Sequence, residues 1–568
     1  MAMAANGSST APAPESPVVN SELNGEMFYQ LLVGEMSARS GDVSTAFVLM
    51  LDAARKSKSE PLYERTVELA LRAGSGESAM QATQQWLRAY PLSAQANRYQ
   101  LQILIGLNRI TETIDPIKKE LASLSNKDRA LAINMLPRYF AQVPDRKQAA
   151  QVVERALDAF LVSPEFGGVA WTTVGRMRLL ANDPAGALDA ATKGVAVTPR
   201  GEEPALLALE LLAPQSARGP QAEALINMHL ATNNQAGIRL AYVRKLLQLQ
   251  RYAEALQQSQ VLTKQAPASP EAWLIQGTLE FQLNNWTAAK ASLNTLVALA
   301  PPAANADNAA STDPGVAQAL FLLAQIAERE DKPSEAQALL ERIVGTQFAL
   351  RVQTRRAALI ARQGRLEEAR ALIRAVPESS PEDARDKRNA EVQLLRDAKN
   401  FKAAYALLQE ALTKTPDDVD LIYDQAMLAE RLEKFGEMEQ LLRRVIAVRP
   451  DYHHAYNALG YSMADRNVNL AQARELLTKA LSFAPNDPYI QDSMAWLEYR
   501  STNYAEALRL LQAAYQARPD AEIAAHLGEV LWVSGQENRA IAIWDEGKKL
   551  SPDNETLLQT IERLRGKP

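Results

Sequence analysis

The residues best suited to chemistry in this chain are its four histidines, His229, His453, His454 and His526. A zinc site needs three or four converging ligands, and the sequence contains no HExxH motif. The adjacent pair His453 and His454 cannot place both rings on one helix face, because residues that share a face are three or four positions apart. The histidines therefore predict surface or packing roles and no bound metal.

One glycine-rich segment, GSGESA at residues 74–79, fits the G-x-G-x-x-A spacing of a nucleotide-binding turn. Such a turn follows a β-strand, whereas residues 63–72 are expected to be helical. We interpret the segment as a turn between two helices. The carboxylate pairs Glu367/Glu368 and Asp417/Asp418 fall at expected helix starts or turns, where capping and dipole effects explain them.

The sequence has no cysteine, which removes disulfides, thiol nucleophiles, iron–sulfur clusters and cysteine-ligated zinc. This absence suits an oxidising compartment as well as the cytosol. No P-loop or nucleophile-elbow motif is visible either. The sequence therefore predicts a protein that is not an enzyme and binds no cofactor.

The charge balance argues against a nucleic-acid partner. There are 62 Lys and Arg residues against 67 Asp and Glu, a formal net charge of -5, where a phosphate-backbone binder would be basic. No run of about 18 consecutive apolar residues is present, so no membrane-spanning helix is expected.

The elements that position these residues recur about every 34 residues. The clearest copy, residues 270–301, reads PEAWLIQGTLEFQLNNWTAAKASLNTLVALAP. At positions 4, 8, 20, 24 and 32 of this copy stand Trp273, Gly277, Ala289, Leu293 and Pro301. These are the positions of the tetratricopeptide pattern, which the copies starting at residues 168 and 521 repeat. The chain thus resembles the tetratricopeptide family.

Extending the register predicts fifteen repeats, which start near residues 27, 60, 94, 133, 168, 202, 236, 270, 317, 350, 385, 419, 453, 488 and 521. The intervals from 94 to 133 and from 270 to 317 are longer than 34 residues. Each repeat is two antiparallel helices too small to bury their own apolar faces, so neighbouring repeats must stack. We predict an all-α fold, and the resemblance implies a right-handed superhelical α-solenoid of about 15 repeats.

We predict four segments along the chain. Residues 1–22 are rich in Ser, Pro and Ala and are expected to be a disordered tether. Residues 23–300 form an N-terminal array of repeats, and residues 301–316 are expected to be a loop insertion. Residues 317–568 form a C-terminal array that is expected to continue the first.

Residues 28–71 (FYQLLVGEMSARSGDV…) and residues 453–547 (HHAYNALGYSMADRN…) resemble a narrower group, the proteobacterial tetratricopeptide lipoproteins of the cell envelope. The most similar type is the lipoprotein adaptor of a C-terminal processing protease. The resemblance implies two partners, the protease and its peptidoglycan hydrolase substrates. It also implies a periplasmic location and an outer-membrane lipoprotein in the native precursor. The sequence contains no lipobox cysteine, so membrane contact is expected only through a lipid anchor absent from this chain.

The resemblance further implies a concave inner face built from the first helix of each repeat. Aromatic residues are scarce overall, yet they gather at the inner positions of the last four repeats. Tyr and Trp are preferred anchors for a protein partner. The predicted partner-binding residues are Tyr423, Met427, His454, Asn457, Tyr461, Tyr489, Asp492, Trp496, Tyr499, Arg500 and Trp532.

Two alternatives stay open for these residues. Trp496 and Trp532 could instead pack between repeats, and His526 could be a peptide contact or a packed histidine. The basic set that clamps a C-terminal carboxylate in co-chaperones is missing, since Asn457 alone is not a clamp. A chaperone-tail receptor is therefore not expected.

The other end of the chain begins with an apolar edge formed by Met27, Phe28, Leu31 and Leu32. No earlier repeat covers this edge, although terminal repeats usually have a polar outer face. We predict a docking surface for a partner or for a second copy in a homodimer. The alternative is a cap formed by residues 17–20.

The leading hypothesis is a non-catalytic adaptor that binds a periplasmic C-terminal processing protease and presents cell-wall hydrolases to it. Holding two partners on one body raises their effective concentration without any chemistry. The alternative is an assembly factor for an envelope secretion, pilus or exopolysaccharide machine. An enzyme hidden among the repeats is disfavoured, because no catalytic motif is visible.

Overall fold

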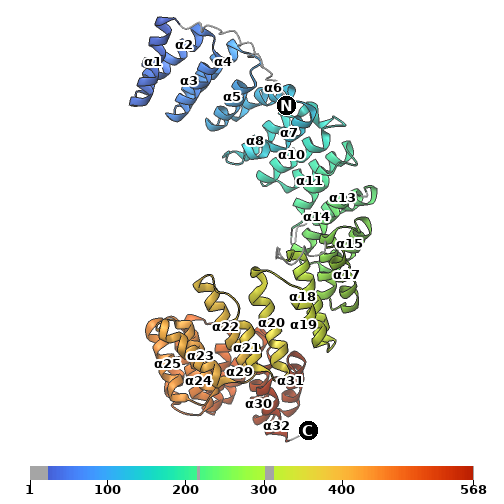
Figure 1. The fold of residues 1–568 in the computed structure, drawn as a ribbon, viewed down its shortest axis with the longest axis vertical. Coiled ribbons are helices and arrows are strands. Elements are labelled where there is room, and N and C mark those ends of the chain that lie inside the picture. The colour runs from blue at the N-terminus through green and yellow to red at the C-terminus, as the bar shows by residue number, and fades with distance from the viewer. Residues whose placement is uncertain (1–23, 214–217, 234, 301–311, 567–568) are drawn as a thin grey trace, which may run out of the picture. The chain divides into compact units, whose positions relative to one another are not determined.

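The computed structural model describes residues 24–213, 218–233, 235–300 and 312–566, and no strand occurs within these ranges. The predicted tether over residues 1–22 and residues 301–311 of the predicted loop lie outside the described residues. The same holds for residues 17–20, the possible cap. The predicted all-α solenoid is confirmed by successive stacked helices (Figure 1).

The chain divides into two compact units, Met1–Pro301 and Pro302–Pro568. The N-terminal unit contains α1 (Gly25–Ser40), α2 (Val43–Ser57), α3 (Glu60–Arg72), α4 (Gly76–Ala89), α5 (Ala94–Gly106), η1 (Ile110–Thr113), α6 (Ile114–Ser123), α7 (Asn126–Tyr139), α8 (Arg146–Ala156), α9 (Asp158–Leu161), α10 (Gly167–Leu180), α11 (Pro184–Val197), α12 (Glu203–Leu211), α13 (Gly219–Thr232), α14 (Ala236–Gln248), α15 (Tyr252–Gln265), α16 (Pro270–Gln282) and α17 (Trp286–Leu299).

The C-terminal unit contains α18 (Pro314–Arg329), α19 (Pro333–Glu341), η2 (Thr346–Phe348), α20 (Ala349–Arg362), α21 (Leu366–Arg374), α22 (Pro381–Asp397), α23 (Phe401–Lys414), α24 (Val419–Arg431), α25 (Phe435–Val448), α26 (His453–Asp465), α27 (Leu470–Phe483), α28 (Pro488–Arg500), α29 (Tyr504–Ala517), α30 (Ala521–Val533), α31 (Glu537–Leu550) and α32 (Glu555–Arg565).

The pair α16 and α17 shows how the sequence builds one repeat. The Ser269 hydroxyl accepts a hydrogen bond from the backbone N–H of Ala272 and caps α16, whose first residue is a proline. Gly277 has no side chain because a Cβ there would lie 2.7 Å from Leu293 of α17. Trp273 donates its indole N–H to the Pro267 carbonyl at 2.8 Å, which ties the helix to the preceding turn. The predicted positions 8 and 24 therefore form the contact between the two helices.

The turn after the first helix recurs with the same backbone in thirteen repeats. In each, a residue with positive φ lies 14 residues after the predicted start of the repeat. These residues are Gly41, Gly74, Asn108, Asn182, Gln250, Asn284, Asp331, Gly364, Lys399, Glu433, Asn467, Thr502 and Gly535. The predicted period is thus confirmed, and the GSGESA segment is the turn between α3 and α4.

Substitutions at Asn284 test the need for this left-handed turn. Asn284 has φ 62° and an exposed side chain, so a change there acts mainly through the backbone. We expect Asn284→Val to destabilise α16 and α17 by about 1–2 kcal/mol, because β-branched residues resist the left-handed region, while Asn284→Gly loses nothing. Hydrogen exchange of the amides in α16 and α17 measures the difference. Equal protection in both variants would contradict the expectation.

Three boundaries differ from the predictions. The predicted repeat start at residue 133 falls inside α7, which begins at Asn126 and carries Pro137 within it. Helices α7 and α8 both pack on α10 and do not form a regular hairpin. The end of the predicted loop 301–316 is helical, since Asp313 caps α18 and the helix starts at Pro314. Beyond the fifteenth repeat, α32 packs on α30 as an additional final helix.

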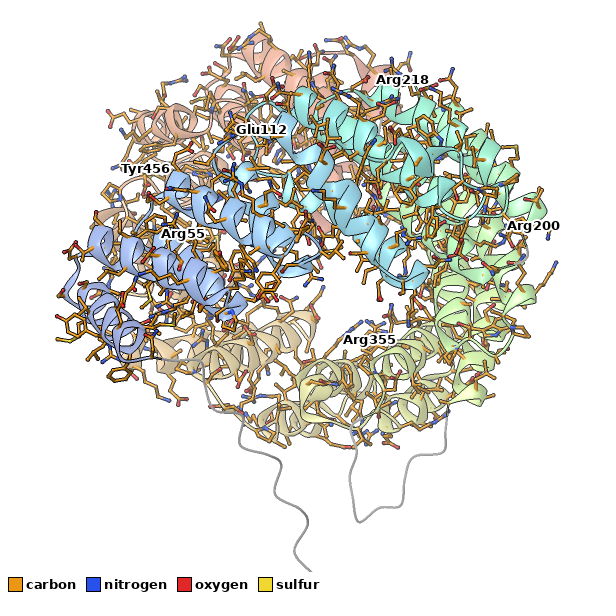
Figure 2. All side chains as sticks on the ribbon, turned by 90° about the horizontal axis from the view of Figure 1, so that it is seen from above. Arg55, Glu112, Arg200, Arg218, Arg355 and Tyr456 are labelled. Carbon is orange, nitrogen blue, oxygen red and sulfur yellow. The ribbon has the colours of Figure 1, made fainter. Side chains whose placement is uncertain are left out.

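Ion pairs join the first helices of neighbouring repeats. Arg355 on α20, labelled in Figure 2, pairs with Glu328 on α18 at 2.6 and 2.9 Å, and the glutamate side chain is only 8% exposed. Arg65 on α3 pairs with Glu35 on α1 in the same two-bonded way. Two parallel bonds fix the geometry as well as the charge contact. These pairs therefore set how adjacent repeats face each other.

Candidate functional site

A buried ion pair lies on the inner side of the last repeats, between α28 and α30. The imidazole Nδ1 of His526 is 2.9 Å from one carboxylate oxygen of Asp492 and 3.0 Å from the other. Both side chains are buried, at 3% and 8% exposure. Burial alone would lower the pKa of His526, but Asp492, with Glu522 and Glu529 nearby, outweighs it and raises this pKa.

Two aromatic side chains complete this group. The Trp496 ring stacks on the imidazole of His526 with the centroids 4.2 Å apart, and its indole N–H donates to Asp465 at 3.1 Å. The Tyr461 hydroxyl of α26 lies 3.4 Å from Nε2 of the same imidazole. We call Tyr461, Asp492, Trp496 and His526 the His526 cluster. It joins three first helices, α26, α28 and α30, from successive repeats.

Repeats that are not neighbours in the chain also meet in the C-terminal unit. Tyr461 and His526 are 65 residues apart, and one repeat lies between theirs. Lys399 pairs with Glu555, 156 residues further along. The repeats from α22 to α32 therefore curl back so far that their inner and end surfaces touch.

Carboxylates surround the His526 cluster. Burial raises the pKa of Glu430 on α24, which is half-buried, and Asp465 adds to the effect. Burial also raises the pKa of Tyr461, as do the carboxylates of Asp465, Asp492 and Glu522. Glu522 remains exposed to solvent. This inner face combines aromatic rings with uncompensated negative charge, which suits a partner segment that carries basic side chains.

The structure brings together only some of the predicted partner-binding residues. Tyr461, Asp492 and Trp496 belong to the His526 cluster, and Tyr499 lies 4.9 Å from Trp496. Asp492 and Trp496 are buried, and His526 is a packed, paired histidine, which favours the packing alternative for these residues. The Trp532 ring lies 5.5 Å from the core residue Trp544 and packs between helices.

The remaining predicted residues lie apart from that cluster. Tyr423 and His454 each contact the Tyr452 ring, at 5.5 and 5.7 Å. Tyr489 is 39% exposed with Arg518 above its ring. Half-buried positions are occupied by Met427, Asn457 and Arg500. At the other end of the chain, Met27 and Leu31 are half-buried, while Phe28 is 56% exposed.

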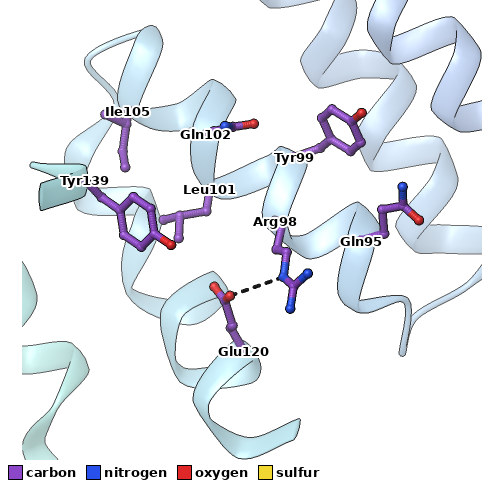
Figure 3. A pocket seen from close by; sticks show the side chains of 8 residues that line it. All are labelled: Gln95, Arg98, Tyr99, Leu101, Gln102, Ile105, Glu120 and Tyr139. Carbon is purple, nitrogen blue, oxygen red and sulfur yellow. Dashed lines mark ion pairs between the residues drawn. The ribbon is translucent and has the colours of Figure 1, made fainter. Parts of the chain in front are cut away.

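A second surface, which the sequence analysis missed, lies between α5 and α7 in the N-terminal unit. It is a pocket of about 340 Å³, called here the α5–α7 pocket (Figure 3). The Arg98 guanidinium faces Glu120 across it, with Nε 3.5 Å from the carboxylate. The eight lining residues are Gln95, Arg98, Tyr99, Leu101, Gln102, Ile105, Glu120 and Tyr139.

The α5–α7 pocket lies where the repeat pattern is irregular. Gln95, Arg98, Gln102 and Ile105 occupy positions 2, 5, 9 and 12 of the repeat that starts near residue 94. These are the inner positions that identified candidates in the last four repeats. The long interval from 94 to 133 was the available signal, because α7 packs on α10 and leaves space beside α5.

No metal centre or membrane span is evident in the part of the chain that the structure describes. Within these residues, no three His, Asp or Glu side chains converge in a way that could hold a metal ion. None of the described helices combines the length and the apolar character needed to cross a bilayer.

Family comparison agrees with the repeats seen in the structure. The family described as "Tetratricopeptide repeat" matches residues 240–304, 321–384, 423–488 and 493–555. The chain is a tetratricopeptide-repeat protein. Tetratricopeptide repeats form scaffolds for protein–protein interaction and are generally non-catalytic.

Curated relatives carry the same repeats. A TPR repeat-containing protein of Pseudomonas aeruginosa is 34% identical over 246 residues, which are 43% of this chain and 42% of that protein. A tetratricopeptide repeat-containing protein of Caenorhabditis elegans is 26% identical over 136 residues, 24% of this chain and 17% of that protein. The chain thus spans less than half the length of either relative.

Solved tetratricopeptide structures are similar to about a third of the chain. A thermophilic TPR protein of Thermus thermophilus has a TM-score of 0.29 at 20% identity and covers 31% of this chain and 95% of its own. MamA of Desulfovibrio magneticus has a TM-score of 0.25 at 15% identity and covers 30% of this chain and 95% of its own. Because both TM-scores are low, the site is interpreted from this chain's own residues.

Proposed function

We propose that this tetratricopeptide protein is a non-catalytic adaptor that binds a C-terminal processing protease and presents peptidoglycan hydrolases to it for degradation. The likeness of residues 28–71 and 453–547 to envelope adaptors of this kind supports the proposal. The proposal includes a periplasmic location and, in the native precursor, an outer-membrane lipoprotein. It also holds that the protein performs no catalysis of its own.

The observation that carries the proposal is the presence of two chemically different surfaces on one chain. The α5–α7 pocket belongs to the N-terminal unit, and the acidic, aromatic inner face around the His526 cluster belongs to the C-terminal unit. An adaptor has to hold two proteins at once, and doing so raises the concentration of one around the other. Two different surfaces suit two different partners.

The α5–α7 pocket suits a neutral segment with an apolar side chain. Glu120 offsets the charge of Arg98, while Leu101 and Ile105 supply apolar walls. Gln95 and Gln102 can bond the amides of a peptide backbone. The C-terminal inner face, in contrast, suits a basic segment.

A reconstituted degradation assay tests the adaptor. The full chain is combined with a C-terminal processing protease and a hydrolase substrate, and the rate of substrate loss is measured. We expect the chain to accelerate the loss, and we expect Tyr139→Ser in the pocket or Glu522→Lys on the inner face to reduce the acceleration by about tenfold or more. Both side chains reach solvent, so the fold should be retained.

Binding assays show which surface each variant has affected. Each variant should lose one binary interaction and keep the other, while the exposed control Val162→Ser should keep both. Acceleration that survives both variants, or a chain that binds no such protease, would contradict the adaptor. Recovery of a secretion, pilus or exopolysaccharide assembly component from envelope extract would favour the assembly factor instead.

A further inference from the structure

Helix α1 carries an apolar face that no described residue covers. Phe28, Tyr29, Leu32 and Met36 are 56, 68, 47 and 62% exposed. Residues 28, 32 and 36 follow one another at intervals of four, and Tyr29 lies beside them, so all four share one side of the helix. Scattered exposed apolar residues are normal, but four on one helix face indicate an interaction surface.

The opposite side of α1 is already occupied. A Cβ on the buried Gly34 would lie 3.1 Å from the Met50 side chain of α2, and the Gln30 amide donates to the Leu49 carbonyl at 2.9 Å. The exposed face is therefore not needed for packing on α2. It remains available to another chain.

The two ends of the array differ in how they are finished. At the C-terminal end, α32 buries Leu557 and Ile561 against the preceding repeat and presents mainly polar residues, such as Gln559 and Glu562, to solvent. A solenoid protein needs such polar terminal surfaces to stay soluble as a monomer. Helix α1 lacks this polar finish.

The exposed face of α1 is complementary to a second copy of itself. Phe28 and Met36 are each four residues from Leu32, so an antiparallel pair centred on Leu32 sets Phe28 of one helix against Met36 of the partner subunit. Gly25 and Arg39 are each seven residues from Leu32, and nothing lies within 4 Å of the Cβ position of Gly25. Arg39 therefore has room on the partner helix, beside the exposed Glu26.

We propose that this tetratricopeptide protein forms a homodimer through α1, with two copies of the helix packed antiparallel about a two-fold axis at Leu32. The antiparallel arrangement places Arg39 of each subunit near Glu26 of the partner subunit, whereas a parallel arrangement sets the two Arg39 side chains against each other. A two-fold dimer is also the commonest closed assembly of identical chains. This inference does not depend on the adaptor function.

The size of the face sets the strength of the dimer. A helix of 16 residues is about 24 Å long. One such helix pair buries less surface than the roughly 1,200–2,000 Å² of a stable interface. The dimer is therefore weak, and it forms in the micromolar range of protein concentration.

Cysteine cross-linking tests the arrangement directly, because the natural sequence contains no cysteine. Leu32→Cys should oxidise to a covalent dimer, since the two-fold axis brings residue 32 beside its own copy. Phe28→Cys alone should not cross-link, because its two copies are about 12 Å apart along an antiparallel pair, beyond the roughly 7 Å that a disulfide spans. A mixture of Phe28→Cys and Met36→Cys should cross-link. Leu92→Cys, at a residue that is 97% exposed, is the control for random collision.

Sedimentation velocity over a range of concentrations gives the second measurement. The natural chain should shift from monomer to dimer, whereas Leu32→Asp should stay monomeric with an unchanged circular dichroism spectrum. A natural chain that remains monomeric at all concentrations, with no Leu32→Cys cross-link, would overturn the proposal. That result would follow if residues 1–23 or a different protein cover α1. Self-cross-linking of Phe28→Cys would overturn the antiparallel arrangement.

Discussion

Asp492→Asn should remove about 3–5 kcal/mol from the stability of the last repeats, because it leaves a buried histidine without its charged partner. Asp492 and His526 are 2.9 Å apart and almost fully buried, and the pair connects α28 to α30. Stability in a solenoid adds up from repeats and their interfaces, so the loss should concentrate in α26, α28 and α30. Hydrogen exchange of the amides in these helices measures it.

A matched carboxylate elsewhere provides the control for Asp492→Asn. Asp417 pairs with Arg444 at 3.2 Å but is 78% exposed. Exposed ion pairs contribute about 1 kcal/mol or less, so Asp417→Asn should have little effect. Equal losses in the two variants would show that burial of the Asp492–His526 pair is not important.

The same pair gives the C-terminal repeats a defined pH dependence. The pKa of His526 is raised by Asp492, so the folded chain keeps a proton that the unfolded chain releases near pH 6.5. The stabilisation is therefore complete below about pH 6.5 and is lost as the pH rises through the higher pKa of the folded state. The protection of α30 should fall over this range in the natural chain and fall less in Asp492→Asn.

Trp544→Ala is expected to have an effect of similar size. The Trp544 side chain is 1% exposed and fills the space between α30 and α31. Removing a buried tryptophan costs about 3–5 kcal/mol, from lost contacts and from the cavity left behind. Thermal unfolding of the full chain, with hydrogen exchange to assign the loss to α30, α31 and α32, measures the change.

Gly528 on α30 makes this prediction specific. A Cβ at Gly528 would lie 2.0 Å from the Trp544 indole nitrogen, so Gly528→Ala should destabilise the natural chain by about 1–3 kcal/mol. In the Trp544→Ala background the clash is gone, and the same change should be tolerated. Leu550→Ala, on the same helix but 52% exposed, is the control. Additive losses from the first two changes would contradict this account.

The fold was predictable because each repeat carries its own packing signals. Gly277 and Leu293 are 16 residues apart, and that spacing alone sets them against each other across one hairpin. The left-handed turn residues then follow at the predicted positions, whether they are Gly, Asn or Lys. Local spacing therefore determines the hairpin and its period.

The candidate site was harder to predict because it depends on how the repeats wind. Asp492 and Trp496 occupy inner positions, but only the curl of the C-terminal repeats brings Tyr461 and His526 to them and buries the group. The α5–α7 pocket arises from the irregular packing of α7, which no repeat pattern describes. Contacts between repeats and departures from the period are therefore the part that the sequence did not reveal.

The contact between Lys399 and Glu555 has a consequence for the C-terminal repeats as a coil. It joins two side chains that are 72% and 58% exposed, at opposite ends of the curl from α22 to α32. Dissolved ions screen such a pair over about 8 Å at physiological ionic strength, and over shorter distances in brine. The coil is consequently closed at its ends by an attraction that salt weakens, while the buried His526 pair within it is shielded from salt.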